Sequence, residues 1–186
     1  QGPRLGIERI RQILAVRTRP LLCGVLKPLG RTATELAELA AGLVEGEVDL
    51  IKDDQSLVTQ RWSPFEERVA RCAEAIGDRS RRRGRPCLYF AHVSGASETM
   101  WKRAARAKAL GATGLLIAPG LTGFDAMRSL SLDKSLNLPI LSHPTFLGTS
   151  VGSERGGVAP GVLYGLLPRL AGADLTIYPA FGSGYP

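Results

Sequence analysis

A lysine and two acidic residues follow a short apolar Leu-Ile pair in the first third of the chain, where the sequence reads Lys52-Asp53-Asp54-Gln55. Side chains alternate faces along a strand, so Lys52 and Asp54 point one way and Asp53 points the other. A lysine and a carboxylate that converge at the end of a strand can form a cation site. A salt bridge at the end of a strand explains the same residues, and for an isolated Lys-Asp-Asp it is the better interpretation.

Polar or conformationally special residues also follow the other short apolar segments. In chain order they are Lys27, His92, Gly120, His143 and Gly182. Structural alternatives exist for several of them, since Lys27 could be a lysine satisfied at a strand end and His143 a buried structural imidazole. If all these segments are parallel strands of one sheet, the residues that follow them meet at one edge.

The elements that would position these residues alternate between short apolar strands and longer amphipathic helices. Two capping boxes mark helix starts, one at Thr32-Ala33-Thr34-Glu35 and one at Ser63-Pro64-Phe65-Glu66. Such alternation predicts right-handed βαβ units and a parallel sheet. The predicted strands cover residues 21–26, 48–51, 87–90, 114–117, 139–142 and 175–178, and the predicted helices cover 7–16, 98–110, 158–170 and the segments that follow 32, 63 and 122.

Two α/β architectures fit this order, an open doubly wound sheet and a (β/α)8 barrel. An open sheet usually carries a glycine-rich phosphate loop after its first strand, and Lys27-Pro28-Leu29-Gly30 is not one. The chemistry-bearing residues follow many different strands, which favours the barrel. With 186 residues and about six β/α units, the chain is shorter than the roughly 250 residues of a typical barrel. We therefore expect an incomplete (β/α)8 TIM barrel.

Composition and charge exclude several classes of function. The chain is 44% hydrophobic and 22% charged, as in globular domains, and no apolar run approaches the roughly 20 residues of a membrane span. Three scattered cysteines, Cys23, Cys72 and Cys87, suggest a reducing cytoplasm. The net charge is +7, but the arginine cluster at 79–85 has almost no interleaved aromatics, so we interpret it as a solvated connecting loop rather than a nucleic-acid site. A basic surface suits anionic, phosphorylated substrates.

Several short motifs, in this order and spacing, resemble the large subunit of RuBisCO and most closely the RuBisCO-like (form IV) proteins. They are Gln1-Gly2-Pro3, Arg19-Pro20-Leu21-Leu22, Leu26-Lys27-Pro28, Asp49-Leu50-Ile51-Lys52-Asp53-Asp54, Phe65-Glu66-Glu67-Arg68, Met100-Trp101-Lys102-Arg103-Ala104, Leu121-Thr122-Gly123-Phe124 and Ala171-Gly172-Ala173-Asp174. Each motif alone is weak, but the whole series makes chance resemblance very improbable.

The resemblance implies a Mg2+ centre and a catalytic role for two further residues. In that family the lysine matching Lys52 reacts with CO2 to form a carbamate, which binds Mg2+ beside the acids that follow it. The candidate metal ligands are thus Lys52, Asp54, Gln55 and Asp53, although alternation turns Asp53 away and gives it an equally good structural explanation. The lysine matching Lys27 moves a proton, and His143 falls where the family places a histidine near metal and substrate.

The same resemblance implies a phosphorylated substrate, with His92, Gly120 and Gly182 as candidate contacts. The reaction would be enolisation, isomerisation or decarboxylation of a phosphorylated sugar or sugar acid through a Mg2+-stabilised enolate. Family sites span two subunits, so a homodimer or a larger homo-oligomer is expected.

Departures from the family pattern argue against a true carboxylase. Gln55 replaces a carboxylate ligand, no second lysine follows Lys27-Pro28, and Pro144 stands where carboxylases place a phosphate-binding arginine. No lysine occurs at 181–185, where carboxylases have a mobile one. Two alternatives stay open: a barrel that has lost its chemistry and binds or regulates, and, less favoured, a true ribulose-bisphosphate carboxylase.

The chain also lacks parts that the family has, namely a small N-terminal domain and the last two β/α units. It starts at Gln1 rather than Met, so an upstream segment is expected. We interpret residues 1–186 as a partial RuBisCO-type barrel domain from a longer protein, inactive alone.

Overall fold

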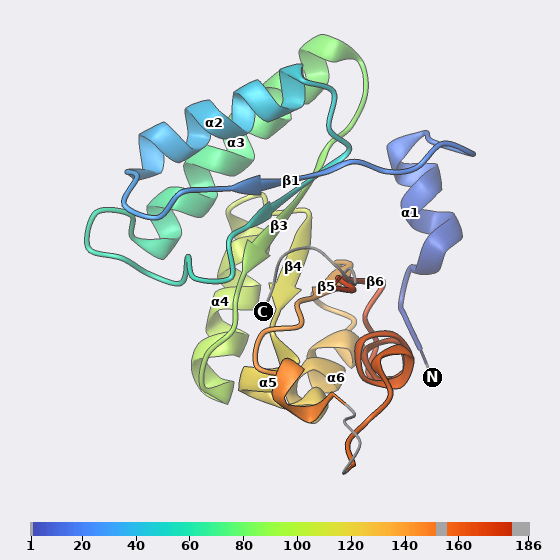
Figure 1. The fold of residues 1–186 in the computed structure, drawn as a ribbon. Coiled ribbons are helices and arrows are strands. Elements are labelled where there is room, and N and C mark those ends of the chain that lie inside the picture. Colours follow the sequence, from blue (N-terminus) through green and yellow to red (C-terminus); the bar gives the residue numbers. More distant parts are fainter. Residues whose placement is uncertain (1, 152–155, 180–186) are drawn as a thin grey trace.

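Six parallel strands form one sheet in the computed structural model, which describes residues 2–151 and 156–179 (Figure 1). The strands are hydrogen-bonded in chain order from β1 to β6, and every neighbouring pair is parallel. Sequential order is that of a barrel, because a doubly wound sheet reverses its order at a switch point. The expected incomplete barrel is confirmed. The strands are β1 (Cys23–Leu26), β2 (Leu50–Asp53), β3 (Leu88–His92), β4 (Gly114–Ile117), β5 (Ile140–Ser142) and β6 (Leu175–Thr176).

Helices connect the strands and follow the predicted segments closely. They are α1 (Gly6–Leu14), α2 (Ala33–Glu45), α3 (Phe65–Arg83), α4 (Ser97–Ala109), α5 (Pro119–Thr122), α6 (Phe124–Leu132) and α7 (Leu167–Leu170), with a 3-10 turn at Gly148–Ser150 and a π-helix at Gly161–Leu166. The capping box of Thr32 and Glu35 is confirmed, since the Glu35 carboxylate accepts from Thr32 N and the Thr32 hydroxyl accepts from Glu35 N.

Two sequence predictions about helices are wrong in detail. The second capping box does not form, because Pro64 occupies the N-cap of α3 and the Ser63 hydroxyl is buried without a hydrogen bond there. The last predicted helix begins at Gly161 rather than Val158, and its first six residues have π-helical geometry before α7 continues it. Apolar periodicity located both helices, but it carries little information about their first turn.

Alternating side chains divide the core into two layers. Ile51, Tyr89 and Leu115 belong to the cluster that packs under the helices, where α2 and α3 lie side by side (Figure 1). Leu50, Phe90 and Leu116 belong to the other cluster, on the inner face of the half-barrel. Because side chains alternate along a strand, Lys52 lies on the same face as Leu50, and Asp53 lies on the same face as Ile51. The sheet therefore places Lys52 inside the barrel and Asp53 beneath the helices.

The N-terminal helix α1 closes the inner layer where the strands begin. Its Ile10 and Leu14 are buried against Leu50, Leu88 and neighbouring inner residues. The Asp174 carboxylate accepts from the backbone N–H groups of Leu5 and Gly6 at 2.7 and 2.8 Å, which binds the start of α1 to the segment before β6. A carboxylate at a helix N-terminus is favourable for the helix dipole.

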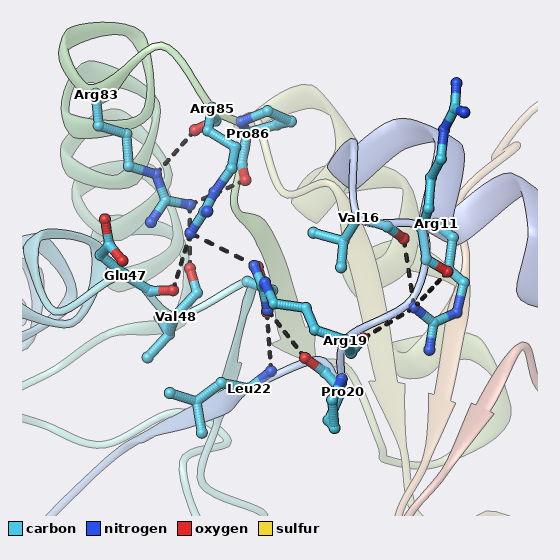
Figure 2. A network of polar contacts seen from close by, with 12 residues as sticks. Arg11, Val16, Arg19, Pro20, Leu22, Glu47, Val48, Arg83, Arg85 and Pro86 are labelled. Atoms are coloured by element: carbon cyan, nitrogen blue, oxygen red, sulfur yellow. Dashed lines mark hydrogen bonds and ion pairs between the residues drawn. The ribbon is translucent and has the colours of Figure 1, made fainter.

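Figure 2 shows a network of arginines at the end of the barrel where the strands begin. The Arg83 guanidinium donates to four backbone carbonyls, those of Val44, Val48, Arg85 and Pro86, at 2.9 to 3.0 Å. The interpretation of residues 79–85 as a solvated connecting loop is therefore wrong. Residues 79–83 form the last turn of α3, and Arg83 binds carbonyls at the end of α2 and in the α2–β2 and α3–β3 connections.

Asp49, just before β2, is the acidic centre of the same network. Arg19 donates to both of its carboxylate oxygens at 2.7 and 2.6 Å, and Leu22 N donates at 2.9 Å. The Arg19 hydrogen bonds lower the pKa of the fully buried Asp49 carboxyl.

Among the described helices none is long and apolar enough to cross a membrane.

We predict that Asp49→Asn lowers the free energy of unfolding of the full-length protein at pH 7 by roughly 1–3 kcal/mol, because it weakens charge-assisted hydrogen bonds in a buried position. The folded pKa lies below the unfolded one, so this stabilisation exists above about pH 4 and is lost as pH falls further. Urea unfolding of both proteins between pH 3 and 7 measures it.

The control is Asp78→Asn, which removes an exposed partner of Arg81 on α3 and should change stability by less than about 1 kcal/mol. A difference between Asp49→Asn and the unsubstituted protein that stays constant down to pH 3 would contradict the assignment.

Candidate active site

The candidate site lies at the carboxyl end of β2, on the inner face of the half-barrel. Lys52 is 5% exposed, and its ammonium donates to the backbone carbonyl of Asp53 at 3.0 Å. Asp54 is 3% exposed; its Oδ1 accepts from Ser56 N at 2.9 Å and its Oδ2 lies 3.0 Å from Lys27 Nζ. Lys27, at the end of β1, is more than half exposed. The site thus joins one buried lysine, one buried carboxylate and one accessible lysine.

Burial changes the acid–base properties of Lys52. It lowers the pKa of the ammonium from 10.5, and the nearby Asp54 and Asp53 carboxylates only partly oppose that shift. A lysine with a lowered pKa is more often present as the neutral amine, which is the form that reacts with electrophiles. The Asp54 carboxyl has a lowered pKa despite its burial, because Ser56 and Lys27 stabilise the carboxylate.

Asp53 faces the opposite side of the sheet and is occupied by structural contacts. Its carboxylate accepts from the Tyr89 hydroxyl at 2.9 Å, from His92 N at 3.0 Å and from Arg68 Nη2 at 3.3 Å. Both Asp53 and Arg68 have fully buried side chains. This is the structural alternative that alternation suggested, and we leave Asp53 out of the ligand set proposed below.

Arg68 is an important residue that sequence reasoning did not single out. Besides its contact with Asp53, its Nη2 donates to the carbonyls of Leu57 and Val58 at 3.1 and 3.2 Å, and so fixes the loop that follows the candidate ligands. A signal was present, because position 68 falls in the apolar stripe of α3 between Phe65 and Cys72. A charged residue on such a stripe indicates a buried ion pair.

His143 follows β5 and faces the same inner site. Its Nδ1 accepts from Thr145 N at 3.2 Å and lies 2.7 Å from the Thr145 hydroxyl, so we assign the proton of the neutral ring to Nε2. Burial and the positive charge of Lys52 lower the pKa of His143 to about 4. At neutral pH the imidazole is therefore uncharged and presents an Nε2–H donor.

His92, the last residue of β3, is 1% exposed, and burial lowers its pKa to about 4. It lines a cavity of about 260 Å3 together with Gln55, Ser94 and Arg103. Sequence reasoning missed Arg103 as a cavity residue. Arg103 belongs to the Met100–Ala104 motif, but the motif did not indicate that its side chain points into this cavity.

Gly120, at the start of α5, allows two loops of the site to approach each other. A Cβ added there would lie 2.3 Å from the carbonyl oxygen of Thr145 and 3.2 Å from Leu147 N. Glycine is thus required for the turn after β4 to pack against the loop that carries His143. Gly182, the remaining candidate substrate contact, lies outside the described residues.

Comparison with known proteins decides the family. A family model described as the ribulose bisphosphate carboxylase large chain, catalytic domain, matches residues 6–185. The chain belongs to this family. Within the RuBisCO family it is similar to proteins named RuBisCO-like, as the motifs indicated: a solved RuBisCO-like protein of Alicyclobacillus acidocaldarius is 35% identical with a TM-score of 0.90, over 99% of this chain and 47% of that one.

Two curated relatives carry similar names. The ribulose bisphosphate carboxylase-like protein of Archaeoglobus fulgidus is 39% identical over 97% of this chain and 41% of its own length. The 2,3-diketo-5-methylthiopentyl-1-phosphate enolase of Geobacillus thermodenitrificans is 38% identical over 98% of this chain and 45% of its own length. This RuBisCO-family chain spans less than half the length of either relative.

We predict that Gly120→Ala displaces the loop at 144–147 and lowers the free energy of unfolding by roughly 1–3 kcal/mol, since the added methyl group has no space. The His143 ring resonances should shift in an NMR spectrum of the full-length protein. Gly165→Ala is the matched control, because nothing lies within 4 Å of a Cβ there. Equal effects of the two substitutions would show that the close approach is unimportant.

Proposed function

We propose that this chain supplies the metal-binding and proton-transfer part of a RuBisCO-like enzyme that forms an enolate from a phosphorylated sugar or sugar acid. The observation that carries the proposal is the pairing of Lys52 and Asp54 on the inner face of β2, with Lys27 3.0 Å from Asp54. Among the candidate reactions, enolisation is the one for which the similar Geobacillus relative is named.

Mg2+ fits the donors present. Asp54 Oδ2 is buried and has an ion pair but no hydrogen bond in the described part of the chain, so it has a lone pair to offer. Gln55 adds an amide oxygen. Lys52 would complete the set as a carbamate, formed when its neutral amine bonds to the carbon of CO2 and releases a proton. Mg2+ prefers such oxygen donors, and when bound it lowers the cost of negative charge on an enolate oxygen.

The chain's own side chains would handle the proton and the substrate oxygens. Lys27 extends from β1 toward Asp54, and its accessible side chain would accept a proton from a carbon beside a carbonyl when it is the neutral amine and return that proton from the ammonium. His143, neutral and held by Thr145, would direct its Nε2–H toward a substrate oxygen. His92 and Gly120 remain proposed substrate contacts, and so does Gly182.

The proposed whole protein contains more than these residues. The edge strands β1 and β6 each pair with a single neighbour among the described residues, as expected if two further β/α units complete the barrel. We propose that an N-terminal domain and these units belong to the same protein and that residues 1–186 alone are inactive.

Homodimers are proposed because family sites span two subunits, and the RuBisCO of Hyperthermus butylicus, 28% identical with a TM-score of 0.85, is described as dimeric. A cytoplasmic location fits the free thiols.

A second candidate is a barrel that binds or regulates without catalysis. Two observations favour it: Gln55 replaces a charged ligand, and no three His, Cys, Asp or Glu side chains converge as a metal site within the described ranges. A true carboxylase is the least supported alternative, because Pro144 replaces the expected arginine.

We predict that the full-length protein with Mg2+ and CO2 catalyses hydrogen–deuterium exchange beside the carbonyl of a phosphorylated keto-sugar, and that Lys52→Ala lowers the rate at least about 100-fold. Lys108→Ala serves as the control and should retain full activity, because Lys108 is an exposed lysine on α4 whose ammonium donates to the Ser135 carbonyl. Exchange by NMR measures both. No exchange on any phosphorylated keto-sugar, together with no Mg2+ uptake, would favour the binding-protein alternative.

Gln55→Glu is predicted to tighten Mg2+ binding by roughly tenfold or more, because a carboxylate replaces a neutral amide oxygen. Calorimetric titration of Mg2+ into both full-length proteins, with CO2 present, gives the two dissociation constants. Unchanged Mg2+ affinity would remove Gln55 from the ligand set and leave it as a lining residue of the adjacent cavity.

A further inference from the structure

The cavity of about 260 Å3 beside Gln55 lies at the mouth of the half-barrel, where the connections after β2, β3 and β4 meet. Its polar lining consists of Gln55, His92, Ser94, Thr122 and the guanidinium of Arg103. Among the described residues that line the cavity none is a carboxylate, and the one charged side chain there is the Arg103 cation.

The charge of Arg103 has no acidic partner among the described residues. Its Nη1 donates to the Ser94 carbonyl at 2.7 Å, and its guanidinium carbon lies 5.8 Å from the centre of the Phe65 ring. Burial and the neighbouring Arg68 cation lower its pKa, so its surroundings oppose its charge. Arg106, one turn further along α4, differs because it is paired with Glu66 at 2.8 Å.

His92 is a second, independent indication of a ligand. It is 1% exposed, and neither ring nitrogen has hydrogen-bonding geometry with a described residue, although the Leu57 carbonyl lies close enough to influence its pKa. A buried polar group without a partner is unfavourable, and a ligand that accepts its N–H would remove that cost.

The backbone around Gly95 leaves room for the guanidinium. A Cβ at Gly95 would lie 3.0 Å from Arg103 Nη1, so a glycine here permits the close approach. The Ser94 hydroxyl accepts from Ala118 N at 2.9 Å and keeps its own proton for donation. Arginine, hydroxyl, amide and imidazole donors around one small cavity match a tetrahedral oxyanion.

We propose that this cavity binds a phosphate-class oxyanion, separate from the phosphate that the last two β/α units are expected to hold. The anion is either a second anionic group of the substrate, which would rest on the proposed function, or free inorganic phosphate. In both cases Arg103 provides the charge and His92 a hydrogen bond.

The test titrates inorganic phosphate into the full-length protein with EDTA present, so that no metal contributes. We expect binding that perturbs the His92 ring resonances, assigned through their loss in His92→Gln. Arg103→Gln should weaken this binding roughly tenfold or more, and the matched Arg106→Gln less than twofold. If Arg103→Gln does not fold, Arg103→Lys and His92→Gln carry the comparison, and each should weaken binding.

Two outcomes would overturn the proposal: no His92 shift at high phosphate concentration, or equal phosphate affinity in the Arg103 variants and the unsubstituted protein. Competition by a phosphorylated keto-sugar would assign the cavity to the substrate, and its absence would assign it to free phosphate. Proton exchange without Arg103-dependent phosphate binding would refute this site alone. Phosphate binding without any proton exchange would instead refute the proposed enolate-forming function.

Discussion

The carboxylate of Asp53 joins three elements of the half-barrel, since it accepts from Tyr89 and from the backbone of His92 on β3 and from Arg68 on α3. The ion pair is fully buried, so removal of one partner would leave an uncompensated charge and cost about 3–5 kcal/mol. These contacts fix the rotation of β2. Because side chains alternate, fixing Asp53 outward also fixes Lys52 and Asp54 inward. The positions of the chemical groups thus depend on a pair that does no chemistry.

Burial sets the charge state of the inner site. It lowers the pKa of Lys52, His92 and His143, whereas Ser56 and Lys27 lower the pKa of Asp54 against the effect of burial and keep it a carboxylate. A site with two neutral imidazoles and a lysine that loses its proton more readily presents donors and a nucleophile rather than a cluster of cations. This is the state that a carbamate-forming lysine requires, and among the described residues the nearby Arg103 is a positive charge without an acidic partner.

The strands were predictable because each is a short apolar run bounded by polar residues, and all six appear within two residues of their predicted limits. Side-chain alternation along each strand was enough to predict which residues lie on the inner face. Features that depend on how helices and loops pack could not be predicted in this way. Ser63 has the right type and spacing for a cap, yet Pro64 takes the N-cap position and the hydroxyl is buried. The arginines at 79–83 have a solvated composition, yet Arg83 binds four carbonyls at the end of α2 and in two connections.

The sequence by itself determined the family, the parallel α/β class and the identity of the residues at the strand ends, because these depend on residue type, period and order along the chain. Only the tertiary structure decided what each residue contacts. It separated Asp53 from Asp54, explained Gly120 by the approach of Thr145, and brought Arg103 from α4 beside His92 from β3. These relations arise between residues far apart in the chain, and such contacts depend on how helices pack on the sheet, which no local pattern encodes.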